Sequence, residues 1–181
     1  SINNFKTVDD RRISQLNFEN IKINSDQIVA SGDEAERLMI DAINYGTLCV
    51  SAEAVGCMES CYLKTVEYTK SREQFGQPIS NFQVLQHNMV DMFIEAELCK
   101  SLLYKSMIDM HENNDSKYRS VSALKSQVGL SGKKVGEDAV QLHGGMGVSE
   151  EMSIGHYLKR FISIDSQFGN SHFHLKKFNN S

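Results

Sequence analysis

One apolar stripe constrains the fold of this chain more than any other feature of the sequence. Between residues 34 and 72, apolar and small side chains recur every three or four residues, which is the spacing of one face of an α-helix. The stripe consists of Leu38, Ala42, Tyr45, Cys49, Ala52, Val55, Tyr62 and Val66. It predicts a single helix over residues 34–72. Gly46 and Gly56 are expected to allow close approach of a neighbouring segment, because each weakens a helix by about 1 kcal/mol relative to Ala.

Three further helices follow from similar stripes. They are expected over residues 81–112, 116–143 and 150–163. The first of them comes after Pro78, with Ser80 as its N-cap, and the second ends at the glycines of "HGGMG". The last opens at Ser149 and has two acidic residues in its first turn. Negative side chains there stabilise a helix, because its N-terminal end carries a partial positive charge. Beyond Asp165 the pattern is ambiguous, and "FGNSHFHLKKF" could form one more short helix.

The first 31 residues follow a different pattern. Leu16 and Phe18, and then Ile21 and Ile23, alternate with polar residues, and "VDDRR" before them is a turn signal. One or two β-strands are therefore expected in this segment. The helices after it are long and joined by short connections, so we expect an all-α fold, an up-and-down four-helix bundle, over residues 32–181.

Charge and hydropathy argue against several classes of protein. The formal net charge of −4 and a pI near 5.9 leave no broad basic face, so no nucleic-acid partner is expected. No apolar run approaches the roughly 18 residues that a membrane span needs. The N-terminal "SINNFKTVDD" lacks the charged-then-apolar order of a secretion signal. We therefore expect a cytoplasmic protein without a membrane span.

The four cysteines are expected to be reduced. Cys49, Cys57 and Cys61 fall on the first predicted helix, where one-turn spacings cannot close a disulfide. A metal site at Cys57 and Cys61 would need histidines nearby, and the sequence places none there. Together with Cys99, these residues are interpreted as small buried helix residues, and no metal site is expected.

The first candidate site lies in "REQFGQPISNFQ", where the long helix gives way to a loop. Arg72 stands at the expected end of the helix, beside exposed backbone amides between Phe75 and Gln77. A guanidinium pairs with two phosphate oxygens at once, and an aromatic ring offers a flat apolar face, so a nucleotide-like ligand suits this group. The alternative is that Arg72 caps helix carbonyls and Phe75 belongs to the core.

The second candidate site is "AVQLHGGMG", residues 139–147. Gln141 and His143 lie on the last turn of a predicted helix, and the glycines after them leave bare backbone that a ligand can approach closely. The segment matches neither the GxGxxG dinucleotide fingerprint nor the GK[ST] of a phosphate loop. A plain helix C-cap is the alternative interpretation.

Together, these stretches resemble the C-terminal helical domain of the acyl-CoA dehydrogenases, over nearly the whole chain. The resemblance rests on "YTKSREQFGQPISNFQVLQHNMVDM", "AVQLHGGMGVSEE" and "HYLKR", and the sequence looks most similar to the pimeloyl-CoA dehydrogenase small-subunit type. It implies that residues 1–31 are the end of the family's middle β-domain and that residues 32–181 are its helical domain. It also implies that the complete protein carries FAD and acts on an acyl-CoA thioester, within a homo- or heterotetramer.

The resemblance also carries cofactor contacts over to matching residues. The family's "RxxFG" motif and a nearby "FQ" glutamine contact the FAD of a neighbouring subunit. The family's "QxxGG" segment approaches the same cofactor from across the dimer interface. The expected cofactor-binding residues are therefore Arg72, Phe75, Gln83, Gln141, Gly144 and Gly145.

The family's catalytic base has no counterpart at the expected positions. In the family, a glutamate removes the α-proton of the thioester while a hydride passes to the flavin, and the two known placements of that glutamate fall on Gly169 and Gly46. A glycine cannot accept a proton, so no catalytic residue is assigned. Glu53 is a poor substitute and is expected to make a polar contact between helices or with other domains. His172 and His174 are expected at the surface or as capping groups.

Three functions stay open on the sequence alone. The resemblance favours the C-terminal domain of an FAD-dependent acyl-CoA dehydrogenase. The absence of the glutamate favours a non-catalytic structural subunit of a heteromeric acyl-CoA dehydrogenase. A helical bundle that is unrelated to flavin and presents an interaction surface is the third, and it requires both motif matches to be chance.

Overall fold

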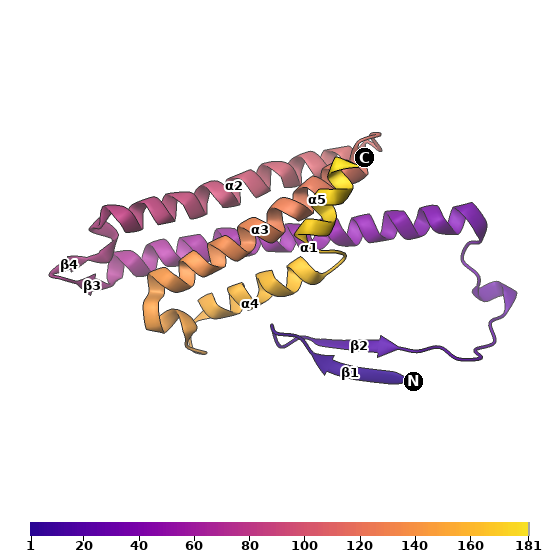
Figure 1. Cartoon of the computed structure of the whole chain (residues 1–181), viewed down its shortest axis with the longest axis horizontal. Helices are drawn as coiled ribbons and strands as arrows, with labels where there is room; N and C mark the ends of the chain where they lie inside the picture. Colours follow the sequence, from indigo (N-terminus) through magenta and orange to yellow (C-terminus); the bar gives the residue numbers. More distant parts are fainter. Residues whose placement is uncertain (181) are drawn as a thin grey trace.

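The computed structural model describes residues 1–180, most of which are helical (Figure 1). Its helices are α1 (Gly32–Ser71), α2 (Gln83–His111), α3 (Lys117–His143), α4 (Ser153–Ser166) and α5 (Ser171–Asn179). Its strands are β1 (Ile2–Lys6), β2 (Arg12–Leu16), β3 (Glu73–Gln74) and β4 (Gln77–Pro78). The short 3₁₀ turns are η1 (Ser25–Gln27), η2 (Ile79–Asn81) and η3 (Gly144–Val148). The expected all-α bundle is confirmed, and the ambiguous tail adds the helix α5.

Helix α3 is the centre of the bundle. It packs against α1, α2, α4 and α5, and Figure 1 shows α1, α2 and α3 running side by side while α5 crosses α3. The buried face of α1 differs from the predicted stripe, whose members Leu38, Ala42, Tyr45, Cys49 and Ala52 are exposed. Asn44, Thr47 and Ser51 lie on the buried face instead, because their side chains donate to carbonyls of α1 itself. Beyond them, Val55, Met58 and Cys61 join side chains of the other helices in one continuous apolar core. Among its fully buried members are Met58, Met92, Leu124, Val128 and Ile154. Burial of these side chains is the main stabilising contribution to the bundle.

Two helix starts differ from expectation. Ser80 is not an N-cap, because it lies inside the turn η2 and α2 begins only at Gln83. Ser149 does not open α4, because its hydroxyl and its backbone N–H both donate to the Met146 carbonyl. Ser149 therefore closes η3, the helix starts at Ser153, and the two acidic residues precede the helix.

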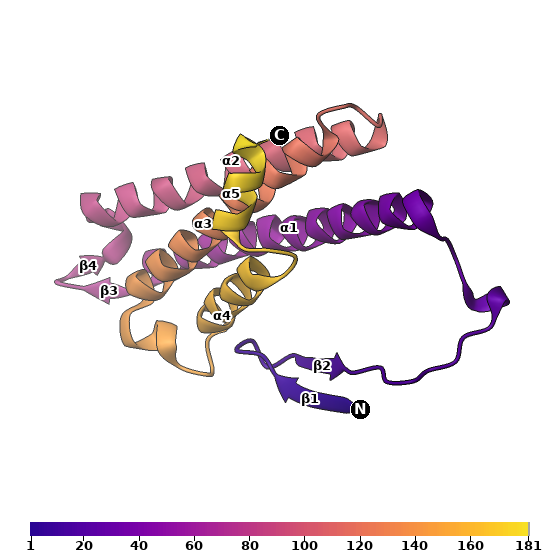
Figure 2. The ribbon, with the colours of Figure 1, turned by 45° about the vertical axis from the view of Figure 1, so that its right-hand side comes forward.

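The N-terminal segment forms one hairpin, which meets the described helices only through the residues of its turn. Strands β1 and β2 pair antiparallel, with Ile2 opposite Leu16. The expected strand through Ile21 and Ile23 is wrong, because no further strand of the described chain lies beside these residues to pair with them. Figure 2 shows the connection from β2 to α1 swinging wide of the bundle.

The cysteines are free, and two of the four are core residues. Cys61 and Cys99 are fully buried, and burial raises the pKa of Cys61 to about 12 and that of Cys99 to about 11. Cys57 is half-buried and Cys49 is exposed, so the interpretation as a core residue is wrong for Cys49. Within residues 1–180, no group of three or more His, Cys, Asp or Glu side chains could hold a metal ion.

Candidate functional site

The end of α1 is shaped by a two-residue turn. Strands β3 and β4 pair directly after α1, and the Ile79 N–H donates to the Arg72 carbonyl at 2.8 Å, which closes the small hairpin. Its tip is Phe75 and Gly76, which both have positive φ (55° and 78°), as a tight hairpin turn requires. The Phe75 side chain is 91 % exposed, so its interpretation as a core residue is wrong.

The end of α3 supplies bare backbone. The Gly144 N–H donates to the Gln141 carbonyl, and Gly144 has a φ of 59°, which a residue with a side chain rarely adopts. A methyl group built on Gly144 or on Gly145 would meet no atom within 4 Å. The backbone at the start of η3 therefore faces open space, and a ligand can reach it.

These two helix ends face each other across one hollow of about 440 Å³. Arg72 lines it from the α1 side, and Gln141, Gly144 and Gly145 line it from the α3 side. The structure thus brings together four of the six residues expected to bind the cofactor. Tyr68 lines the same hollow and was missed, although it precedes Arg72 by one helical turn and so shares its face of α1.

The other two expected residues lie elsewhere. Phe75 projects from the hairpin tip, and its ring meets Phe82 edge to face with 6.0 Å between ring centroids. Gln83 lines a separate surface hollow on α2, together with His87 and Asp91. Within this chain, Phe75 and Gln83 therefore do not share the hollow of Arg72.

Arg72 carries a free charge at the rim of the hollow. Its side chain is exposed, and within residues 1–180 the structure gives its guanidinium no hydrogen bond and no ion pair. Arg72 therefore does not cap helix carbonyls with its side chain. A guanidinium that is not engaged by protein groups is available for an anionic ligand.

His143 forms the wall behind the glycines. Its ring is buried and stacks on Tyr68 with 4.1 Å between centroids, and its Nδ1 lies 2.8 Å from the Ala139 carbonyl. Burial lowers the pKa of His143, so the neutral ring donates from Nδ1 to that carbonyl. Nε2 is buried without a partner in the described chain. His143 therefore fixes the wall of the hollow and adds no charge to it.

Both positions expected for a catalytic base are closed by aromatic rings. A methyl group on Gly46 would lie 2.7 Å from Cζ of Phe168, so the ring of Phe168 covers that point of α1. Gly169 has a φ of 100°, and a methyl group there would lie 2.5 Å from the ring of Phe173. Close approach is thus confirmed for Gly46. It is wrong for Gly56, where nothing lies within 4 Å.

The turn that carries Phe168 is held by two buried basic side chains. Lys125 Nζ donates to the Asp165 carbonyl at 2.9 Å and to the Gly169 carbonyl at 2.8 Å. His174 Nε2 lies 3.0 Å from the Phe168 carbonyl, and His174 is only 2 % exposed. The expectation of a surface or capping role for His174 is therefore wrong, because its ring supports this turn from inside, whereas His172 is exposed.

Glu53 is fully engaged in an ion pair. Arg160 donates to both of its carboxylate oxygens, from Nε at 2.8 Å and from Nη2 at 2.6 Å. The pKa of Glu53 lies below its ordinary value because the hydrogen bonds from Arg160 outweigh the effect of burial. This confirms the expected polar contact between helices, since Glu53 lies on α1 and Arg160 on α4.

Comparison with known proteins gives this arrangement a family. Residues 37–176 match the family model described as "Acyl-CoA dehydrogenase, C-terminal domain". A curated relative, "Acyl-CoA dehydrogenase, short-chain specific" of Megasphaera elsdenii, is 27 % identical over 147 residues, which cover 80 % of this chain and 38 % of the relative. The chain therefore spans well under half the length of that relative.

Solved structures agree on the fold. Butyryl-CoA dehydrogenase from Megasphaera elsdenii superposes with a TM-score of 0.92 at 22 % identity, covering 98 % of this chain and 47 % of that one. The ChsE4-ChsE5 complex from Mycobacterium tuberculosis gives a TM-score of 0.90 at 22 % identity, covering 99 % of this chain and 48 % of that one.

The chain belongs to the acyl-CoA dehydrogenase family, through the C-terminal domain of that family. FAD is the cofactor of the family. The lining of the hollow fits the diphosphate of such a cofactor, because a free guanidinium and the side-chain amide of Gln141 lie beside bare glycine backbone that a ligand can approach closely. Among the described helices, none is long and apolar enough to cross a membrane.

Proposed function

We propose that this chain is the C-terminal domain of an FAD-dependent acyl-CoA dehydrogenase subunit, which oxidises an acyl-CoA thioester between its α and β carbons. In this proposal residues 1–31 are the end of a middle β-domain, and the hollow at Arg72 receives the diphosphate of an FAD held mainly by a neighbouring subunit. One observation carries the proposal. The hollow that Arg72 lines also contains the bare backbone of Gly144 and Gly145.

The residues of the hollow would each contribute a defined contact. The Arg72 guanidinium would donate to two phosphate oxygens, and its positive charge would offset part of the diphosphate charge. The Gln141 amide would add a neutral donor, and the bare backbone of Gly144 and Gly145 would let the phosphates approach closely. When bound, FAD accepts the hydride that leaves the thioester, whereas none of these side chains can take up the α-proton.

Substitution of Arg72 tests this proposal in the complete protein or its complex. Arg72→Ala should lower flavin retention by roughly 10- to 100-fold, because a charge-assisted hydrogen bond contributes about 1.5 to 3 kcal/mol. Arg72→Lys should recover only part of the loss, because an ammonium cannot bind two oxygens in the same geometry. Flavin absorbance per subunit after dialysis measures both variants.

Arg37→Ala is the matched control, since Arg37 is an exposed arginine near the other end of α1. It should retain flavin as the wild type does. Equal flavin occupancy in wild type and Arg72→Ala would remove Arg72 from the cofactor site.

A second function, that of a structural subunit within a heteromeric enzyme, is favoured by the two glycines. Phe168 covers Gly46 and Phe173 covers Gly169, so neither position has room for a carboxylate in this conformation. A subunit of this kind would complete the flavin site of a partner that carries the base. One structural neighbour, ChsE4-ChsE5 from Mycobacterium tuberculosis, is described as a complex.

Flavin bleaching distinguishes the catalytic subunit from the structural one. The complete protein should be mixed anaerobically with a panel of acyl-CoA thioesters, first alone and then with a co-encoded family member. Bleaching only in the presence of the partner supports the structural subunit, because proton transfer by a positioned base accounts for about 10² to 10⁴ in rate. Rapid bleaching by the protein alone would assign it a base of its own.

Assembly into a tetramer forms part of the proposal. Helix α2 exposes a row of apolar side chains to solvent. They are Val90, Phe93, Ile94 and Leu98, each about half exposed. A row of this kind is expected to be covered in an oligomer. Light scattering that shows a monomer at high concentration would contradict assembly.

The free thiols of the chain support a reducing compartment, and we place the protein in the cytoplasm on that basis.

A further inference from the structure

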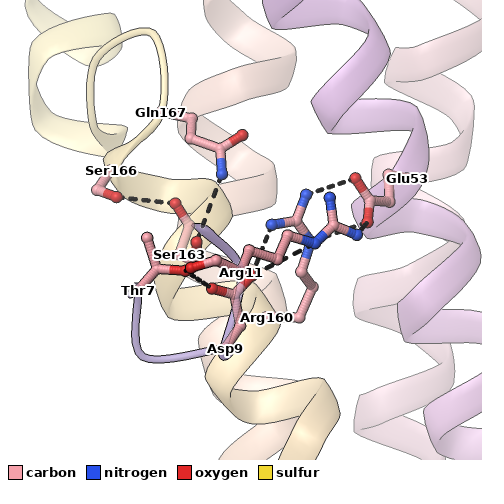
Figure 3. A network of polar contacts seen from close by, with 8 residues as sticks. All are labelled: Thr7, Asp9, Arg11, Glu53, Arg160, Ser163, Ser166 and Gln167. Atoms are coloured by element: carbon pink, nitrogen blue, oxygen red, sulfur yellow. Dashed lines mark hydrogen bonds and ion pairs between the residues drawn. The ribbon is translucent and has the colours of Figure 1, made fainter. Parts of the chain in front are cut away.

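The N-terminal hairpin touches the helical bundle at one place only. Every residue of β1 and β2 is exposed, and among residues 1–29 only Thr7 and Asp9 are even partly buried. Both lie in the turn between the two strands, which Figure 3 shows beside Arg160 and Ser163 of α4. The hairpin therefore shares no apolar core with the helices.

Two charged residues of the hairpin carry the polar part of this contact. Within residues 1–180, every hydrogen bond and ion pair between the hairpin and the helices involves Asp9 or Arg11. Arg160 Nη1 donates to Asp9 at 2.7 Å, although 151 positions separate the two residues in the chain. Arg11 Nη2 donates to Glu53 at 3.0 Å from the hairpin side.

Arg160 stands at the centre of this cluster. It binds Glu53 on α1 through two nitrogens and Asp9 of the hairpin through the third, so one guanidinium joins three segments of the chain. The Arg160 side chain is 10 % exposed and that of Asp9 is 4 % exposed. Two positive and two negative groups balance, and Thr7 donates a further hydrogen bond to Asp9.

The geometry of these ion pairs is better suited to fixing the orientation of the hairpin than to stabilising the fold. A planar guanidinium that is bound on three sides cannot rotate without breaking an ion pair, so it fixes the angle between the groups that it joins. Buried ion pairs contribute little net stability compared with apolar contacts, but the loss of one partner leaves an uncompensated charge. An isolated two-stranded hairpin is itself marginally stable in water, so it depends on what it is attached to.

We propose that Arg160 is a positioning residue that fixes the orientation of the β1–β2 hairpin on the helical bundle, through simultaneous ion pairs with Asp9 and Glu53. This inference does not depend on flavin binding. If the hairpin belongs to a middle β-domain as proposed above, Arg160 also sets the angle between that domain and the bundle.

Backbone ¹⁵N relaxation of the 181-residue chain tests this inference. In the wild type, the hairpin amides should show order parameters of about 0.85, like those of α3 in the same molecule. In Arg160→Gln and in Asp9→Asn, the hairpin values should fall below about 0.6 while those of α3 stay unchanged. Because hairpin and helix are compared within one molecule, the result does not depend on the size of the assembly.

Matched variants separate orientation from general stability. Asp10→Asn is the control, because Asp10 is the neighbour of Asp9 in the same turn but pairs with Lys6 inside the hairpin. It should leave the hairpin rigid. Arg160→Lys should give intermediate values, since one ammonium cannot reproduce the bidentate pair with Glu53 while it holds Asp9.

The double variant Asp9→Asn with Arg160→Gln should be no more mobile than either single variant, because both remove the same link. If Arg160→Gln does not fold, Asp9→Asn decides alone, since Asp9 lies outside the helices. A hairpin that stays rigid in Asp9→Asn, or one that already moves freely in the wild type, would overturn the proposal.

Discussion

Two arginines of this chain sit in opposite environments. Arg72 ends α1 with its side chain exposed and its guanidinium without a partner in the described chain, at the rim of a hollow. Arg160 lies within α4 at 10 % exposure, with carboxylate oxygens on three of its N–H groups. The same side chain can therefore serve two roles. An arginine whose hydrogen bonds the protein satisfies holds segments together, and one that the protein leaves unsatisfied is available to a ligand.

The largest expected difference is in stability. Arg160→Gln should lower the free energy of unfolding by about 2 to 3 kcal/mol. This loss is smaller than for a fully buried ion pair, because the Glu53 side chain is 34 % exposed and water can solvate its charge. Arg72→Ala should change the free energy of unfolding by less than about 0.5 kcal/mol, as is usual at exposed sites without partners. Urea unfolding followed by circular dichroism measures both, and equal losses would remove the distinction between the two arginines.

The loss of stability in Arg160→Gln should become smaller at acidic pH. Burial raises the pKa of Asp9, but hydrogen bonds from Thr7 and Arg160 outweigh it, so the pKa lies below its ordinary value, as it does for Glu53. A carboxylate with a lowered pKa stabilises the fold above its ordinary pKa and loses that contribution as the pH falls through the lowered value. The gap in unfolding free energy between wild type and Arg160→Gln should therefore narrow between pH 7 and pH 3. A constant gap would mean that the ion pairs do not cause it.

Lys125, a buried cation like Arg160, should make stability depend on pH in the alkaline range. Lys125 donates to two backbone carbonyls, and burial lowers its pKa to about 8 although the nearby Asp165 opposes this shift. Its folded form loses the proton before the unfolded chain does, so the wild type should gain about 1 kcal/mol relative to Lys125→Met between pH 7 and pH 9. Thermal unfolding across this range measures the gap. Lys133→Met is the control, because Lys133 is an exposed lysine on the same helix and should show no such trend.

Added salt should have the smallest effect, and it should act on flavin retention at Arg72 more than on the stability that Arg160 provides. Near 1 M ionic strength the screening length is about 3 Å, and exposed charges are screened far more than buried ones. Flavin retention that depends on Arg72 should weaken with added salt, whereas the stability gap of Arg160→Gln should persist. Parallel dialysis and urea series at low and high salt test this, and equal sensitivity would contradict the assigned burial.

The sequence predicts local features of this chain well because helices carry their own pattern. The periodicity from Leu38 to Val66 places the extent of α1 correctly, although most of the stripe is exposed and the buried face is a neighbouring one. The two motifs place Arg72 and the α3 glycines at helix ends that do meet. The starts of α2 and α4 are less accurate, since a serine can cap a helix or close a 3₁₀ turn and only the surrounding backbone decides between the two. The hydroxyl of Ser149 does the latter.

What sequence reasoning misses depends on distant partners. Glu53 and Arg160 are 107 positions apart, and nothing local to either residue names the other. Gly46 is read correctly as a point of close approach, but the approaching ring belongs to Phe168, on a turn held by Lys125. Gln83 follows its motif, yet the fold places it in a different hollow from Arg72.

The two covered glycines bear on how an acidic side chain could be engineered into this domain. A carboxylate at position 46 requires the Phe168 ring to move, and one at position 169 meets both the Phe173 ring and a backbone with a φ of 100° that disfavours any L side chain. An engineered acid at position 46 therefore calls for a paired substitution that shortens the side chain at position 168, whereas position 169 also needs a change in its backbone.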